Sequence, residues 1–151
     1  MMISDMRKLA LQQLSDYQNN NPGTCFDDLD FILNMNSAYE LQDTVTDLRV
    51  TEGEDIIGYK VGCTGSGTTG QFGMKGPIRG TLFDSELLRN ESEIDFNLFT
   101  NLAIEGEMAV TIGANGEIIS AFPVIELHNF VFRAPIKTLP ELIANNGFNA
   151  G

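Results

Sequence analysis

The stretch from Asn101 to Leu127, NLAIEGEMAVTIGANGEIISAFPVIEL, holds two apolar segments on either side of Asn115-Gly116. The first segment alternates between apolar and polar or small residues, which is typical of a strand whose successive side chains face opposite sides of a sheet. Asn-Gly between two such segments is a strong signal for a two-residue hairpin turn. We therefore predict an antiparallel hairpin in which Ala114 pairs with Glu117.

This register places three glutamates on one face of the hairpin. Glu105 and Glu107 are two residues apart and share a face, and Glu126 lies directly opposite Glu105. A solvated outer face is a common alternative for such glutamates, but Ala103 and Ala109 make this face smaller and less polar than usual. The opposite face is predicted to be a core stripe made of Leu102, Ile104, Met108, Val110 and Ile112.

Three carboxylates on one face require a compensating cation or a proton. Two carboxylates about 5 Å apart, at an effective dielectric constant of about 20, repel each other by about 3 kcal/mol. Ligation by oxygen atoms alone favours a hard divalent ion such as Mg²⁺ or Mn²⁺ over zinc. The weak point of this register is Pro123, because proline cannot donate a hydrogen bond to the strand ladder.

Upstream of the hairpin, DIIGYKVGC at 55–63 and RGTLF at 79–83 are each predicted to form a strand. Alternation in the first of these puts Lys60 on one face with Gly58 and Gly62. A lysine on the solvent face is the more common arrangement, and the strand pattern taken alone favours it. The functional alternative is a lysine beside small residues that leave room for a ligand.

The segment after Lys60 contains the spacing G-x-G-x-x-G at Gly65, Gly67 and Gly70. A dinucleotide loop needs a helix that begins within it, because the helix N-terminus binds the pyrophosphate. We predict no helix here, since QFGMKGPIRG follows at 71–80. In a P-loop the lysine comes after the glycines, whereas Lys60 precedes them. A nucleotide site is therefore not favoured.

The remaining segments are predicted to be mainly helical. Helical spacing of apolar residues, with Pro22-Gly23 as a turn and Gly53 as a terminator, predicts two helices before residue 54. Thr138 and Glu141 have the spacing of a capping box, which opens a short helix closed by Asn146-Gly147. The order of elements predicts an α+β fold with an N-terminal helical region at 1–54 and a β-rich domain at 55–151.

The chain has 151 residues and a formal net charge of −12, from 9 basic and 21 acidic residues. Such a charge disfavours binding to nucleic acids and to anionic membranes but is compatible with cation binding. Two cysteines are too few for a disulfide framework, and no apolar run approaches the roughly 18 residues of a membrane span. A signal-peptide core is not evident, so the expected location is the cytoplasm.

Several motifs, taken in order, resemble one enzyme group. They are SAYELQ at 37–42, GYKVG at 58–62, IEGEMAV at 104–110, PVIELH at 123–128 and ELIANN at 141–146. Together they resemble the 2-hydroxypenta-2,4-dienoate hydratase and 4-oxalocrotonate decarboxylase group of the fumarylacetoacetate hydrolase superfamily. The resemblance covers most of the chain beyond residue 37 and implies N-terminal helices followed by the β-rich fold of that superfamily.

The resemblance implies a metal-dependent lyase used in aromatic catabolism. It implies that Glu105, Glu107 and Glu126 bind Mg²⁺ or Mn²⁺, that Lys60 is the catalytic lysine, and that Thr64 lies near the substrate. The implied reaction is hydration of a 2-hydroxy-dienoate to a 4-hydroxy-2-oxo acid. The alternatives are decarboxylation of a 2-oxo-diacid and a non-catalytic, truncated paralogue or accessory subunit.

The implied partners are a small 2-oxo or 2-hydroxy carboxylic acid and either identical subunits or a paralogue. The chain departs from the family pattern at Gly65, where a serine is usual, and at Ile78, where an acidic residue is usual. The family continues well beyond the position of Gly151, so the β-rich fold is expected to be incomplete at the C-terminus. His128 is predicted to be a hydrogen-bonded structural residue rather than a general base.

Overall fold

The computed structural model describes residues 3–21, 24–26, 33–67, 70, 76–129 and 138–149. Helices come first, two antiparallel sheets follow and short helices return at the end, so the predicted α+β class is confirmed. The elements are α1 (Ile3–Gln18), α2 (Met35–Glu52), β1 (Ile56–Gly62), β2 (Ile78–Phe83), β3 (Leu102–Ile112), β4 (Ile118–Asn129), α4 (Leu139–Ala144) and α5 (Asn146–Asn149). Short 3₁₀ turns lie at Thr24–Phe26, Asp84–Glu86 and Phe96–Leu98. The division at residue 54 into two regions stays a prediction, and the turn at 22–23 lies outside the described residues.

Helix α2 shows how local sequence sets the boundaries of the elements. Its N-cap is Asn34, whose side-chain oxygen accepts a hydrogen bond from the Ser37 N–H at 3.0 Å. It ends at Gly53, as predicted, in the left-handed conformation with φ +107°, where a residue without Cβ is favoured. Thr138 caps α4 in the predicted way, since its hydroxyl accepts a hydrogen bond from the Glu141 N–H.

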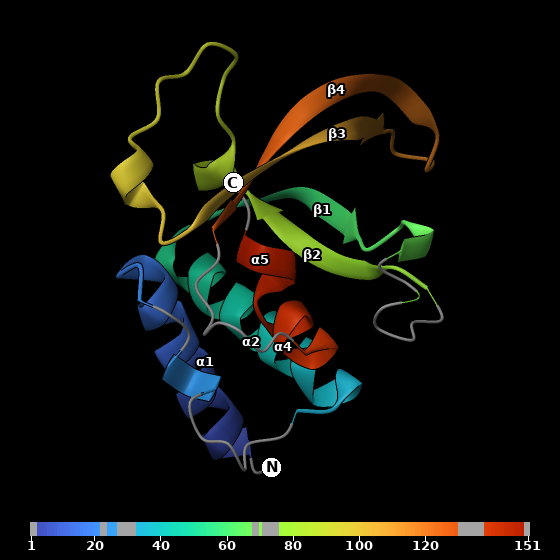
Figure 1. Ribbon diagram of the computed structural model, residues 1–151. Coiled ribbons are helices and arrows are strands. Elements are labelled where there is room, and N and C mark those ends of the chain that lie inside the picture. The colour runs from blue at the N-terminus through green and yellow to red at the C-terminus, as the bar shows by residue number, and fades with distance from the viewer. Residues whose placement is uncertain are drawn as a thin grey trace.

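The hydrophobic core lies on the helical side of the molecule. Helices α4 and α5 lie between α2 and the β1–β2 sheet, while the β3–β4 hairpin rises on the far side of that sheet (Figure 1). The largest apolar side chains that are almost fully buried are Phe26, Leu41, Phe83 and Ile143. Burial of each such side chain contributes about 1.5–3 kcal/mol to folding.

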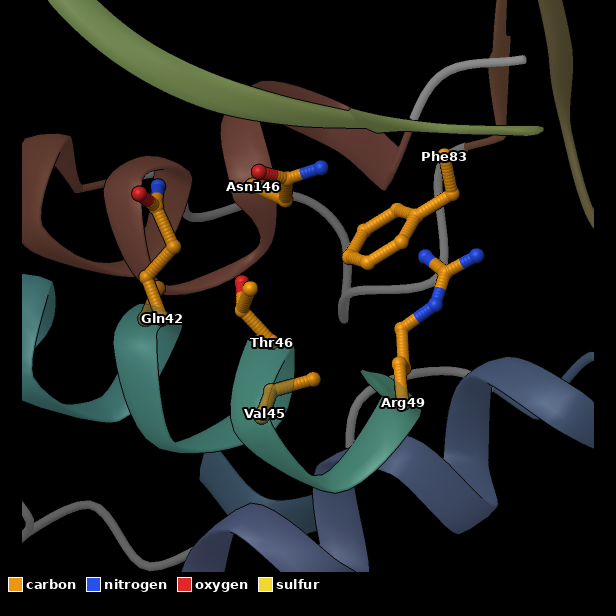
Figure 2. Close-up of a pocket in the computed structure, with 7 residues that line it drawn as sticks. Gln42, Val45, Thr46, Arg49, Phe83 and Asn146 are labelled. Atoms are coloured by element: carbon orange, nitrogen blue, oxygen red, sulfur yellow. The ribbon is translucent and has the colours of Figure 1, made fainter. Parts of the chain in front are cut away.

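A buried ionic cluster ties α1 and α2 to the turn after β2. The Arg49 guanidinium donates hydrogen bonds to Glu54 and Glu86, and it lies 3.6 Å from the centroid of the Phe83 ring (Figure 2). The Tyr17 hydroxyl donates to Glu86 at 2.8 Å. Burial, followed by the charge of Glu86, raises the pKa of Tyr17. The cluster fixes how the helical layer meets the first sheet.

The β3–β4 hairpin has the predicted register at its centre but a different turn. Gly116 donates its N–H to the Gly113 carbonyl, and Gly113 and Glu117 hydrogen-bond across the loop. The predicted two-residue turn with Ala114 opposite Glu117 is therefore wrong. A bulge between Thr111 and Ile112 shifts the pairing by one residue. The longer loop moves the strand pairing by one residue, and the bulge moves it back by one, so the predicted pairing returns beyond the bulge.

Beyond the bulge, Glu105 pairs with Glu126 as predicted. Pro123 lies in the ladder opposite Met108 without ending β4. The predicted core stripe on the other face of β3 is wrong, because Ile104 is 64% exposed and Met108 66% exposed. The physical reason is that, among the described residues, the helices pack mainly against the β1–β2 sheet, and the contact of α5 with β4 leaves the apolar face of β3 uncovered (Figure 1).

The β1–β2 sheet confirms both strands predicted upstream of the hairpin. Lys60 pairs with Gly80, and the ladder runs from Ile56–Phe83 to Gly62–Ile78 with one irregularity near Ile56. Ser66, Gly67 and Gly70 are helical, contrary to the prediction that no helix follows β1; residues 68–69 and 71–75 lie outside the described part of the chain. Within the described residues, no helix is both long enough and apolar enough to cross a membrane.

Candidate metal centre

The register of the β3–β4 hairpin brings three possible metal ligands together. Glu105 on β3 lies opposite Glu126 on β4, and His128 follows two residues later on the same face of β4, opposite Ala103. One ligand atom from each of Glu105, Glu126 and His128 lies within 4.8 Å of the others. These three residues are called the acidic cluster below. It is assembled by a single pair of strands.

Glu126 is the central member of the acidic cluster. Its Oε1 lies 3.2 Å from Lys60 Nζ and its Oε2 lies 3.2 Å from His128 Nε2. His128 Nδ1 lies 4.0 Å from Glu105 Oε1. Burial alone would raise the pKa of Glu126, but the hydrogen bond from His128 and the charge of Lys60 outweigh it, so the pKa is lowered. Glu126 is therefore held as a carboxylate.

Lys60 enters the site from the other sheet. Its side chain is 14% exposed, and Nζ donates hydrogen bonds to Glu126 and to the Gly147 carbonyl at 3.3 Å. The solvent-facing arrangement that the strand pattern alone favoured is therefore wrong. Burial lowers the pKa of Lys60, and the neighbouring Glu126 charge opposes this shift without cancelling it. A lysine of this kind releases its proton at a lower pH than a lysine in water.

Two of the predicted site residues lie outside the acidic cluster. Glu107 is exposed, two residues beyond Glu105 on the same strand and opposite Val124. Thr64 is exposed in the segment that follows β1. The roles assigned to Glu107 as a ligand and to Thr64 as a substrate contact stay predictions.

His128 is the residue that sequence reasoning undervalued. It is 6% exposed and contacts Glu126, which agrees with the expected hydrogen-bonded histidine, yet it also offers a ligand atom beside two carboxylates. The sequence contained the signal, because E-x-H at 126–128 puts both side chains on one face of a strand. The same hairpin register that paired Glu105 with Glu126 also placed His128 on that face.

The chemistry of the acidic cluster fits a divalent cation. Two carboxylates and one imidazole are common ligands for ions such as Mn²⁺, and carboxylates alone suit Mg²⁺. Glu105 lies in an exposed position, whereas Glu126 and His128 are progressively more buried. An ion held there would be anchored on one side by the protein and open to solvent and small ligands on the other.

The small cavity between α2, β2 and the C-terminal helices is not this site. Gln42, Val45, Thr46, Arg49, Phe83 and Asn146 line it together with Ala144 (Figure 2). Its volume of about 10 Å³ corresponds to roughly one water molecule. No organic acid fits a cavity of that size, so this cavity is not a substrate site.

Among the comparisons with known proteins, only the one with solved structures found matches. No protein-family model and no curated protein matches the chain. The structure is similar to 4-oxalocrotonate decarboxylase from Pseudomonas putida G7 complexed with magnesium and adipate, with a TM-score of 0.86 and 20% sequence identity over 98% of this chain. A second structure of that decarboxylase, complexed with calcium and acetate, has a TM-score of 0.83 at 20% identity.

The match covers only part of those solved chains. This chain spans 61% of the first and 60% of the second. At this identity the similarity shows the shared fold, and the shared fold includes the β3–β4 hairpin and the β1–β2 sheet on which the acidic cluster and Lys60 lie.

Proposed function

We propose that the chain is a divalent-metal-dependent lyase of the fumarylacetoacetate hydrolase superfamily, acting on a small 2-oxo or 2-hydroxy carboxylic acid. The observation that supports this most is the meeting of the acidic cluster with buried Lys60 at the junction of two sheets. The fold supports it as well, since structures of the same fold are a decarboxylase complexed with magnesium or calcium and a carboxylate.

Each residue has a role in this proposal that its surroundings support. Glu105 and Glu126 would hold the ion, with either His128 or the predicted Glu107 as a further ligand. When bound, a divalent ion supplies Lewis acidity that stabilises the enolate of a chelated 2-oxo carboxylate. Lys60, with its pKa lowered by burial, would hold or move a proton on the substrate next to that charge. Thr64 would contact the substrate from the segment after β1.

Within this class, hydration is the first candidate reaction: water adds to a 2-hydroxy-dienoate and gives a 4-hydroxy-2-oxo acid. Decarboxylation of a 2-oxo-diacid is the second, and the decarboxylase identity of the structurally similar proteins favours it. Both reactions would need the same ligands for the ion and the same lysine beside it, so the acidic cluster is compatible with either.

The surface of the hairpin is relevant to the expected assembly. Several large apolar side chains of β3 and β4 are more than half exposed, among them Ile104, Met108 and Ile125. Exposed apolar surface of this kind is typical of protein interfaces. It supports the expected association with a second copy or with a paralogue, including the alternative of an accessory subunit that completes its site only in a complex.

The first experiment measures thermal unfolding with and without MgCl₂ or MnCl₂. An ion that binds the folded chain but not the unfolded chain stabilises the folded state by about 2.7 kcal/mol at an ion concentration 100 times Kd. We expect the stabilisation to be lost in Glu126→Gln and in Glu105→Gln, and retained in Glu93→Gln, a matched change at an exposed acidic residue outside the site. If neither ion stabilises the wild-type chain, the metal site is contradicted.

Two further variants identify the third ligand. His128→Gln and Glu107→Gln are compared in the same assay, and the variant that weakens the apparent affinity for the ion more marks the better ligand. Activity is then followed as loss of dienol absorbance for hydration and as CO₂ release for decarboxylation. A stable chain that is inert alone but active with a second chain would support the accessory role.

A further inference from the structure

The start of α5 is fixed to β2 by one side chain. The Thr81 N–H donates a hydrogen bond to Asn146 Oδ1 at 2.6 Å, and Asn146 Nδ2 donates to the Thr81 carbonyl at 2.8 Å. The amide of Asn146 thus occupies both backbone hydrogen-bonding groups of Thr81, as a neighbouring strand would. Both residues are buried, at 7% and 2% exposure. Asn146 has φ +56°, a conformation that asparagine tolerates better than most residues.

The side chain of Lys60 lies beside Gly80, between β2 and the start of α5. Lys60 pairs with Gly80 across β1 and β2. A Cβ added at Gly80 would lie 2.8 Å from Lys60 Cε and 2.8 Å from the backbone oxygen of Asn146. Neither distance is tolerated by real atoms, so only glycine at this position lets the lysine side chain and α5 both approach β2.

Lys60 ends against the residue that follows Asn146. Its Nζ donates to the Gly147 carbonyl at 3.3 Å, and the other partner is Glu126 of the acidic cluster. The carbonyl is next to the amide that Asn146 anchors on Thr81. The position of this hydrogen-bond acceptor therefore depends on the Asn146 side chain, and the path of the lysine depends on the missing side chain of Gly80.

We propose that Asn146 and Gly80 are positioning residues for Lys60. Asn146 fixes the Gly147 carbonyl as an acceptor for the lysine. Because Gly80 has no side chain, it leaves the space in which the lysine side chain extends toward the acidic cluster. The functional meaning of this arrangement rests on the proposed role of Lys60. The arrangement itself can be tested without substrate or metal. Both residues act through Lys60: Gly80 lies beside its side chain, and Asn146 positions the carbonyl that accepts its hydrogen bond.

The test measures how fast a small acylating reagent modifies Lys60 relative to Lys8 in the same folded chain, by mass spectrometry of peptides. Lys8 is exposed on α1 and serves as an internal standard. Gly80→Ala fills the space beside the lysine side chain. Asn146→Gly removes the anchoring amide while keeping a residue that adopts positive φ easily.

Two variants serve as controls. Gly58→Ala adds the same methyl group to the same sheet at a position where its Cβ meets only Leu82, at an ordinary 3.8 Å. Leu14→Ala, at a core residue of α1 that is 3% exposed, destabilises the chain from a helix rather than from either of the two sheets. The second control separates loss of position from general loss of stability.

In the wild type we expect Lys60 to react more slowly than Lys8. In Gly80→Ala and Asn146→Gly the Lys60/Lys8 ratio should rise about tenfold, the change expected when a hydrogen bond to a charged group is lost. The ratio should stay unchanged in Gly58→Ala. An unchanged Lys60/Lys8 ratio in both test variants overturns the proposal. The proposal is also overturned if Leu14→Ala, with a melting temperature equal to that of the test variants, raises the ratio as much as they do.

Different results would contradict the proposed function and the positioning role. A wild-type chain without lyase activity that still shows the expected ratios contradicts the function and supports the positioning role. Where the wild type is active, Gly80→Ala and Asn146→Gly should lower kcat with little change in KM, because the acidic cluster that holds the ion is untouched. An active chain whose ratios do not change contradicts the positioning role alone.

Discussion

Two regions of the molecule differ in what holds them together. One is the helical half, made of α1, α2, α4, α5 and the β1–β2 sheet with the turn after it, and the other is the β3–β4 hairpin. The helical half buries Leu41 and Ile143 completely and encloses the charges of Arg49 and Glu86. The hairpin exposes apolar side chains on both faces, with Ile104 at 64% and Ile125 at 71% exposure on one face and Phe122 at 44% on the other. Among the described residues, stability comes mainly from the helical half, while the acidic cluster comes from the hairpin.

The acidic cluster and the hydrophobic core lie in different regions of this chain. Lys60 belongs to a strand whose inner face packs toward α5, and it reaches Glu126 across the junction between the two sheets. Exposed Glu105 of the acidic cluster can change without disturbing the core. A change near Lys60 affects both the site and the packing of the C-terminal helices.

The largest effect is expected from breaking the buried ion pairs of the helical half. Arg49→Met keeps an apolar side chain beside Phe83 but leaves the carboxylate of Glu86, only 8% exposed, without its cation. Loss of one partner of a buried pair costs about 3–5 kcal/mol. We expect this loss in the free energy of unfolding, measured by urea denaturation.

A matched change at the surface calibrates that result. Asp43→Asn removes the exposed pair with Arg79, whose side chains are 55% and 44% exposed. Exposed pairs contribute at most about 1 kcal/mol. Equal losses in Arg49→Met and Asp43→Asn would show that burial of the ionic cluster does not decide its contribution.

The next effect compares the two regions directly. Leu41→Ala removes a fully buried side chain from α2 and should lower the free energy of unfolding by about 2–5 kcal/mol. Met108→Ala changes a side chain of β3 that is 66% exposed and should alter it by less than about 0.5 kcal/mol. A comparable loss for Met108→Ala would mean that the hairpin is covered in solution, by a second copy or another chain.

The smallest effect comes from two glycines with positive φ. Gly53 ends α2 at φ +107° and Gly116 lies in the hairpin turn at φ +83°. Alanine in a left-handed conformation costs about 1–2 kcal/mol. We expect Gly53→Ala to lower the global free energy of unfolding by this amount, while Gly116→Ala speeds amide hydrogen exchange in β3 and β4 with less effect on the global value.

The opposite distribution of effects would contradict a difference in stability between the two regions. If Gly116→Ala lowers the global free energy as much as Gly53→Ala does, the hairpin and the helical half unfold as one cooperative unit. Faster exchange confined to the hairpin would show that the acidic cluster is built on the less stable part of the chain.

Local sequence patterns predicted much of the fold. The three-four spacing and the glycine at residue 53 predicted α2, the Thr138 cap predicted α4, and alternation predicted β3. The predicted turn was wrong because Asn-Gly also suits a longer loop with one left-handed residue, and the bulge just before that loop restored the register. Glu105 therefore lies opposite Glu126 for a reason that differs in part from the predicted one.

For the site, strand alternation and hairpin register determined that Glu105, Glu126 and His128 share one face, since alternation depends only on spacing along each strand and the register only on the loop and the bulge beside it. The burial of Lys60, its contact with Glu126, the gap above Gly80 and the anchor of Asn146 were decided by tertiary structure. These contacts join segments that are 65 or more residues apart. Periodicity assigns a residue to a face, but only packing determines what covers that face.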